Sequence, residues 1–138
     1  MKKVLSLILI IAIVCTFSPH AAAEDMESIQ PRYTYISAIH IDFAISSNGL
    51  AEYTAKITTT DYYFTKIECK LQKYNNETDT WTTVYSWTDT GVGRATMSKQ
   101  YMVYSGKYRI AVTGTIYDDN NRVIEIASKA SSSYSYSG

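Results

Sequence analysis

From residue 35 onward, polar and apolar residues alternate with a period of two, and no stretch shows the spacing of an amphipathic helix. Ile39, Ile41 and Phe43, for example, are separated by single residues that fall on the other side of a strand. Because successive side chains of a strand point to opposite faces, this pattern predicts strands with one buried face. The abundant Tyr, Thr, Ile and Val residues suit such pleated strands.

Seven segments carry this pattern and are separated by polar turn residues. They run over residues 35–46, 50–59, 64–74, 81–88, 95–104, 107–117 and 122–129. Asn48-Gly49 after the first segment is a strong hairpin signal, because both residues tolerate a positive φ. Parallel sheets need crossover helices, and this pattern leaves no room for them. We therefore expect one all-β domain, an antiparallel two-sheet sandwich of about seven strands.

The first 23 residues have the three parts of a secretory signal peptide. Lys2 and Lys3 give a positive start, and an almost unbroken apolar stretch follows from Val4 to Val14. Ala21 and Ala23 then supply the small residues that a signal peptidase requires, so cleavage is expected after Ala23.

Two other interpretations of this segment fit less well. A membrane anchor needs about 20 apolar residues, which is more than the stretch contains. A lipid anchor on Cys15 would normally follow a small residue, and Cys15 follows the branched Val14. We therefore expect a secreted, extracellular protein with no stable membrane span after cleavage. Its predicted parts are a signal peptide (1–23), an N-terminal extension (24–34), the β domain (35–130) and a Ser/Tyr tail (131–138).

Charge and cysteine content exclude several kinds of protein. Removing Lys2 and Lys3 leaves 11 of the 13 basic residues against 13 acidic ones, a net charge of −2 without any basic run. Binding to nucleic acid through a basic patch is therefore not expected. Cys69 would be the single cysteine after cleavage, so no intramolecular disulfide can form. It alternates in step with Ile67 and Leu71, which predicts a buried structural thiol.

The mature chain offers little for catalysis and no expected cofactor. It has one histidine, His40, which falls on the polar side of its strand, and no Gly-x-Ser-x-Gly nucleophile motif. The histidine- and cysteine-rich patterns of zinc sites are absent from the sequence. Asp118 and Asp119 could hold a weak Ca²⁺, but they are also ordinary turn residues. We expect no enzyme; a glycosidase built on two carboxylates is the remaining enzymatic alternative.

Aromatic residues carry the most functional information. Trp81, Tyr85 and Trp87 are expected on one face of the strand 81–88, where they would form either a binding ridge or part of the core. Tyr62 and Tyr63, next to Phe64, offer a second exposed aromatic candidate. The sequence thus favours a non-catalytic module that recognises an extracellular protein or carbohydrate. The alternative is a structural component that associates through exposed edge strands.

Two resemblances support this interpretation. Gly106-x-Tyr108 resembles the tyrosine corner of immunoglobulin-like domains, with Ile110 in place of their second cysteine. It implies a buried Tyr108 whose hydroxyl bonds to the backbone near residues 101–104. The first cysteine and the tryptophan of the third strand have no counterpart, so the resemblance is to the wider immunoglobulin-like group rather than to antibody domains.

The whole layout is also similar to that of small secreted proteins of unknown function from Gram-positive bacteria. The segments that carry this resemblance are the lysine-start signal, Pro31-Arg32-Tyr33-Thr34-Tyr35-Ile36, Ile67-x-x-x-Leu71-Gln72-Lys73, Trp81-x-x-Val84-x-x-Trp87 and Gly106-x-Tyr108-Arg109. It implies export and a β-sandwich, and no particular activity.

Overall fold

The computed structural model describes residues 32–138, which fold into eight strands and contain no helix. The strands are β1 (Ile36–Ile45), β2 (Leu50–Thr59), β3 (Phe64–Asn75), β4 (Thr80–Val92), β5 (Arg94–Met102), β6 (Gly106–Tyr117), β7 (Val123–Ala130) and β8 (Tyr134–Tyr136). Every strand pair in this range is antiparallel. The expected all-β class is confirmed.

Several predictions concern residues outside this range. The signal peptide 1–23, its cleavage site at Ala21 and Ala23, and most of the extension 24–34 lie outside the described residues. Within residues 32–138, nothing has the length and helical form needed to span a bilayer as a helix.

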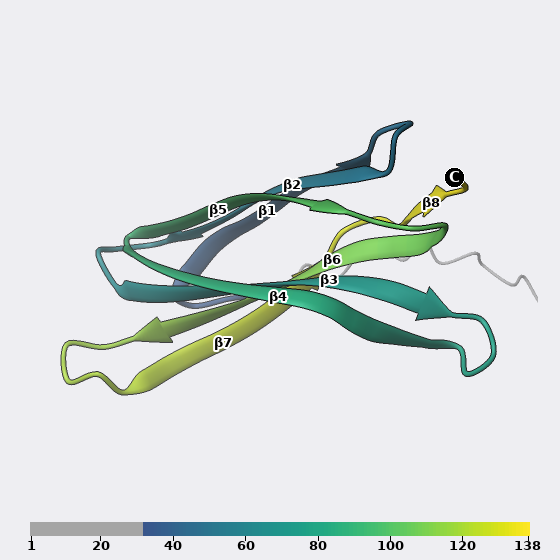
Figure 1. Ribbon diagram of the computed structural model, residues 1–138. Helices are drawn as coiled ribbons and strands as arrows, with labels where there is room; N and C mark the ends of the chain where they lie inside the picture. Colours follow the sequence, from purple (N-terminus) through teal and green to yellow (C-terminus); the bar gives the residue numbers. More distant parts are fainter. Residues whose placement is uncertain (1–31) are drawn as a thin grey trace, which may run out of the picture. The chain divides into compact units, whose positions relative to one another are not determined.

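The strands form two sheets that share one core. One sheet has the order β1-β2-β5; the other has the order β4-β3-β6-β7, and β8 also pairs with β6. Figure 1 shows β1, β2 and β5 in one layer and β3, β4, β6 and β7 in the other. The largest apolar side chains that are fully buried come from β2, β3 and β6: Ile57, Ile67, Leu71, Ile110, Val112 and Ile116. The predicted alternation therefore defines the inner faces of both sheets.

The predicted inward residues of β2 and β3 are buried. Ala51, Tyr53, Ala55 and Ile57 alternate with exposed or partly exposed residues along β2 and are at most 5% exposed themselves. Cys69 is completely buried on β3, which confirms the predicted structural thiol.

Strand β4 departs from the prediction because it contains a β-bulge. Tyr85 pairs with Leu71 and Thr83 pairs with Gln72, which leaves Val84 as an extra residue between them. One extra residue reverses the alternation, so the side chains before and after it point to opposite faces. The prediction that Trp81 shares a face with Tyr85 and Trp87 is therefore wrong. Trp81 lies on the outer face of the sheet, whereas the other two lie on the inner face.

Strands β4 and β5 belong to different sheets and are joined by a single residue, Gly93. The sequence predicted a longer loop here, but β4 continues to Val92 and β5 begins at Arg94. Gly93 has a φ of +70°, which favours glycine. A Cβ on Gly91 would lie 2.0 Å from the carbonyl oxygen of Arg94, so this tight crossing also needs a glycine there. As a result, the edge strands β4 and β5 lie on the same side of the two layers.

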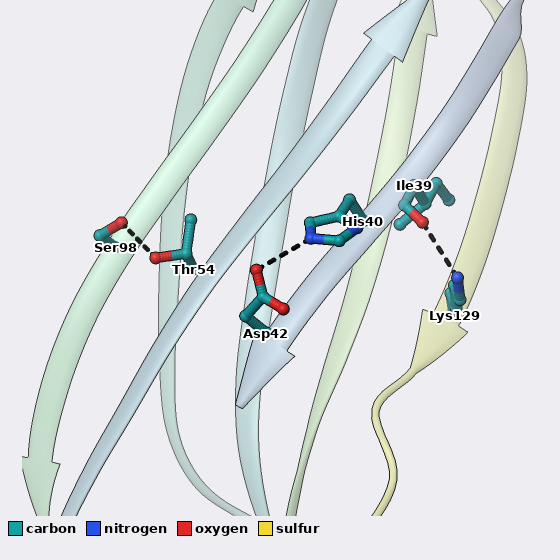
Figure 2. A network of polar contacts seen from close by, with 6 residues as sticks. All are labelled: Ile39, His40, Asp42, Thr54, Ser98 and Lys129. Atoms are coloured by element: carbon teal, nitrogen blue, oxygen red, sulfur yellow. Dashed lines mark hydrogen bonds and ion pairs between the residues drawn. The ribbon is translucent and has the colours of Figure 1, made fainter. Parts of the chain in front are cut away.

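Two charged side chains of β7 close the opposite side. The Glu125 carboxylate accepts hydrogen bonds from the backbone N–H groups of Thr34, Tyr35 and Ile36 at 2.7–2.9 Å. Lys129 Nζ donates to the carbonyl oxygen of Ile39 on β1 at 3.1 Å, as Figure 2 shows. The edges of β1 and β7 are thus joined by polar contacts.

The Ser/Tyr tail is ordered against β6. The Ile110 N–H donates to Ser131 Oγ at 2.9 Å, and the Ser131 N–H donates to the Ile110 carbonyl at 2.8 Å. Beyond this point, β8 pairs with Gly106–Tyr108. The tail therefore adds a short strand beside β6.

Tyr108 stands where the sequence predicted it, at the beginning of β6. Its side chain is 3% exposed, and its hydroxyl donates to the carbonyl oxygen of Tyr104 at 2.9 Å. The ring thus adds buried area while its polar end is satisfied.

Replacing Tyr108 separates these two contributions. Tyr108→Phe is expected to lower the free energy of unfolding by about 0.5–1.5 kcal/mol through the lost hydrogen bond. Tyr108→Ala should lower it by about 3–5 kcal/mol, because it also leaves a cavity. Urea titration followed by circular dichroism measures both. An unchanged midpoint for Tyr108→Ala would contradict the buried position.

Candidate functional site

Four aromatic residues meet where β4 and β5 leave the two layers open. Tyr85 and Trp87 follow the bulge on β4 and point inward, because they pair with the buried Leu71 and Cys69. Tyr53 from β2 and Tyr101 from β5 complete the group, which we call the aromatic opening: Tyr53, Tyr85, Trp87 and Tyr101.

The rings of the aromatic opening become more exposed from its base to its rim. Tyr53 is 5% exposed, Trp87 and Tyr101 are half-buried, and Tyr85 is 48% exposed. Trp87 lies 5.4 Å from Tyr53 and 4.6 Å from Tyr85, measured between ring centres. The sequence left open whether Tyr85 and Trp87 belong to the core or stand on the surface. In the structure they differ in this respect. Trp87 belongs to the margin of the core, and Tyr85 presents its ring to solvent.

The rings do not form a flat platform. Tyr85 is tilted by 51° from Trp87 and by 34° from Tyr101, and Trp87 meets Tyr101 edge-on at 79°. Tilted and edge-on arrangements are the favourable geometries for packed aromatic side chains. The result is an uneven apolar surface in which each ring contacts its neighbours.

Polarisable sulfur groups lie beneath these rings. The Tyr53 hydroxyl donates to the sulfur of the buried Met97 at 3.0 Å. Burial raises the pKa of the Cys69 thiol to about 11, and the nearby Tyr53 hydroxyl opposes part of that rise. Burial likewise raises the pKa of Tyr53. Both groups therefore stay neutral at physiological pH, and Cys69 is not a reactive nucleophile.

Trp81 belongs to a separate cluster on the outer face of the five-stranded sheet. Its ring lies 5.1 Å from that of Tyr74 and 4.3 Å from the guanidinium carbon of Arg109. Arg109 Nε also donates to Gln72 at 2.9 Å, and Lys107 Nζ lies 5.2 Å from the Tyr74 ring centre. Cation–π contacts of this kind join three neighbouring strands and account for Trp81 structurally. The sequence did not indicate Arg109 or Tyr74, because only the shifted register brings them to Trp81.

Tyr62 and Tyr63, the second aromatic candidate, lie in different environments. Tyr63 packs edge-on against Tyr35 at 5.2 Å and borders the core. Tyr62 is 85% exposed and lines a shallow depression with Val92, Gly93 and Arg94. Tyr62 is thus an isolated exposed ring, unlike the connected rings of the aromatic opening.

The outer face of the three-stranded sheet is polar and carries two carboxylates, those of Asp42 and Glu52. Asp42 and Glu52 line an open depression of about 780 Å³. Asp42 lies 2.8 Å from Nε2 of the exposed His40, and Glu52 accepts a hydrogen bond from Gln100.

Two neighbouring hydroxyl groups on this face form a hydrogen bond of their own. The Thr54 and Ser98 hydroxyls lie 2.8 Å apart and bond to each other rather than to His40 (Figure 2). Within residues 32–138, no group of three or more His, Cys, Asp or Glu side chains could hold a metal ion.

Asp118 has a structural role in the β6–β7 turn. Its carboxylate accepts hydrogen bonds from the backbone of Asn120 and Arg122 and from the Arg122 side chain, all at 2.8–2.9 Å. These contacts, above all the bond from the Arg122 backbone, lower the pKa of Asp118. Of the two carboxylates considered for Ca²⁺, that of Asp118 is therefore engaged in holding the turn.

Comparison with known proteins adds no further candidate residue. No protein-family model matches the sequence, and no curated protein matches it. The function must therefore be inferred from the residues and their geometry.

The raised pKa of Cys69 predicts a loss of stability in alkali. The unfolded chain ionises its thiol near the ordinary pKa of about 8.5, whereas the folded chain does so near 11. The stabilisation is therefore complete below about pH 8.5 and is lost as the pH rises toward 11.

Cys69→Ala lacks this titration but keeps the tyrosines that ionise in the same range. The stability difference between the parent and Cys69→Ala should shrink by about 1–2 kcal/mol between pH 8 and pH 10. Urea titrations under reducing conditions measure the difference. A gap that is constant with pH, or rapid labelling of the native thiol, would contradict a buried Cys69.

Proposed function

We propose that this chain is a secreted, non-catalytic recognition module that binds another protein through the aromatic opening. Export is supported by the positive start at Lys2 and Lys3, the apolar stretch after it and the small residues Ala21 and Ala23. The proposal includes kinship with the small secreted proteins of Gram-positive bacteria that the sequence resembles.

We also propose that the domain is an immunoglobulin-like sandwich. The strand order β1-β2-β5 facing β4-β3-β6-β7 supports this, because consecutive hairpins are divided between two antiparallel sheets. The hydrogen bond from Tyr108 to Tyr104 matches the tyrosine corner of such domains. Domains of this group commonly serve as rigid scaffolds, so the fold is compatible with recognition without determining what is recognised.

The observation that carries the proposed function is the exposed ring of Tyr85 on a fixed support. Tyr85 is 48% exposed and contacts Trp87 at 4.6 Å, which in turn contacts the buried Tyr53. Tyr and Trp are the side chains that most often dominate protein interfaces. Because these rings are already held in place, a partner would lose little side-chain entropy on binding them.

The tilt of the rings favours a protein surface over a sugar. Stacking on a pyranose requires an accessible flat ring face, but the Trp87 ring is half-buried between Tyr53, Tyr85 and Tyr101. Uneven apolar surfaces instead suit side chains that fit between them, as in the centre of a protein interface. We therefore choose protein over carbohydrate as the partner class.

Capture from culture medium tests this function. The immobilised exported protein should retain protein from the medium of cells that secrete it, and Tyr85→Lys should reduce the amount by about tenfold or more. Thr54→Lys is the matched control, since Thr54 is exposed on the outer face of the other sheet. Protease treatment of the medium should abolish retention, and periodate should not. Retention that resists protease, or that is equal in Tyr85→Lys, would contradict the proposal.

N-terminal sequencing of the exported chain tests its processing. The exported protein should begin at Glu24. Ala23→Phe should block cleavage because the peptidase requires a small residue there, whereas Ala22→Phe should be tolerated. An intact Met1 on membrane-bound protein would show that the segment is not a signal peptide.

A further inference from the structure

Two cations on the outer face of the five-stranded sheet are not balanced by an acid of the described chain. Lys107 and Arg109 alternate along β6 with buried residues, so both side chains point to the outer face. Lys70, on the same face, forms an ion pair with Glu68 at 3.1 Å. None of the ion pairs within residues 32–138 includes Lys107 or Arg109. Their charge is therefore available to an anion from outside this part of the chain.

Two aromatic rings hold these cations at one place on the sheet. The guanidinium carbon of Arg109 lies 4.3 Å from the centre of the Trp81 ring, and Lys107 Nζ lies 5.2 Å from the centre of the Tyr74 ring. The two ring centres are 5.1 Å apart. Asp79 accepts a hydrogen bond from the Tyr74 hydroxyl at 2.9 Å and forms no ion pair with either cation. Two like charges thus share one aromatic surface, where an anion would relieve their repulsion.

The Arg109 guanidinium is oriented in advance for an oxygen ligand. Its Nε donates to Gln72 at 2.9 Å, and its carbon lies over the Trp81 ring. Nε uses one of the N–H donors of the guanidinium, and those of the two terminal nitrogens remain. The structure shows no hydrogen bond from these nitrogens, or from the Lys107 ammonium, to any of residues 32–138. A guanidinium held in this way loses little side-chain freedom when it binds an oxyanion.

We propose that Arg109 and Lys107 form a binding site for a phosphate group, carried either by the free ion or by a phosphate monoester. The paired terminal nitrogens of Arg109 match two phosphate oxygens, and the Lys107 ammonium can bind a third. A phosphate monoester carries a charge of about −1.5 to −2 at neutral pH, which balances the two cations. A carboxylate has a single charge and fewer oxygens, so phosphate is the better match.

This site is separate from the one in the proposed function. Arg109 and Lys107 lie on the outer face of the five-stranded sheet, whereas Tyr85 and Trp87 of the aromatic opening lie on its inner face. The phosphate site therefore goes beyond protein recognition and does not depend on it.

A titration followed by NMR tests the site and its ligand class. Inorganic phosphate and glucose 6-phosphate are added to the exported protein at about pH 7.5 and constant ionic strength. They should shift the Arg109 Nε–H and Trp81 indole N–H signals with a dissociation constant of about 1 mM or lower. Acetate should bind at least about tenfold more weakly, because it has one charge and two oxygens. Tighter binding of glucose 6-phosphate identifies a monoester as the ligand, and equal binding identifies the free ion.

Variants assign the binding to the two cations. Lys107→Gln should weaken phosphate binding by about fivefold or more, and Lys107 is exposed, so the fold should be unaffected. Arg109→Lys keeps the charge but loses the paired donors, and should weaken binding by about tenfold or more. Lys56→Gln is the matched control, because it removes the same charge from the outer face of the other sheet. It should change the affinity by less than about twofold.

Three results would overturn the phosphate site. They are the absence of a saturable shift up to ~50 mM phosphate, equal binding of acetate, and an unchanged affinity in Lys107→Gln. Urea midpoints show whether Arg109→Lys remains folded, and Lys107→Gln decides the question if it does not. Capture of protein through Tyr85 is measured separately, so failure of the phosphate site leaves the proposed function unchanged.

Discussion

Burial of alternate side chains on β3 and β6 against β2 is the interaction on which the rest of the structure depends. Ile67, Leu71, Ile110, Val112 and Ile116 are at most 1% exposed, and each aliphatic side chain of this kind contributes about 1.5–3 kcal/mol when fully buried. The polar contacts gain their importance from this core. The hydrogen bond of Tyr108 matters because its hydroxyl is carried inside with the ring, where an unpaired group would be costly.

Different interactions cover the core at the two sides where the edge strands of the sheets meet. The two sides of the domain therefore differ chemically. On the side of β1 and β7, Glu125 and Lys129 bind backbone groups directly. Such charge-assisted bonds are directional and leave the edge occupied. On the side of β4 and β5, aromatic rings cover the core without satisfying the outer backbone groups of either strand. Within residues 32–138, the proposed binding surface therefore lies on the second side.

Much of the fold could be predicted from the alternation alone, because a period of two is a direct consequence of strand geometry. The inward residues of β2 and the buried Cys69 followed from it, whereas the corner at Tyr108 was implied by the resemblance of Gly106-x-Tyr108 to immunoglobulin-like domains. The bulge at Val84 could not be predicted in this way, since one extra residue changes neither composition nor turn signals. For the same reason the sequence placed Trp81 with Tyr85, and the separation of the two aromatic groups emerged only with the register. The hydrogen bonds from residues 34–36 to the Glu125 carboxylate could not be predicted either, because they join residues about 90 positions apart.

The bulge also explains how one strand contributes both to stability and to the proposed binding surface. Without it, Trp81 would point inward with Trp87, and Arg109 and Tyr74 would lose their aromatic neighbour on the outer face. With it, the segment before Val84 is fixed by contacts within its own sheet, while the segment after it presents Tyr85 at the opening. A bulge of this kind re-aims side chains at a defined position and is typical of sheet edges near functional sites. The exposed ring thus stands on the part of β4 that follows the bulge, at the edge of the sheet, while the part before the bulge is held by Tyr74 and Arg109.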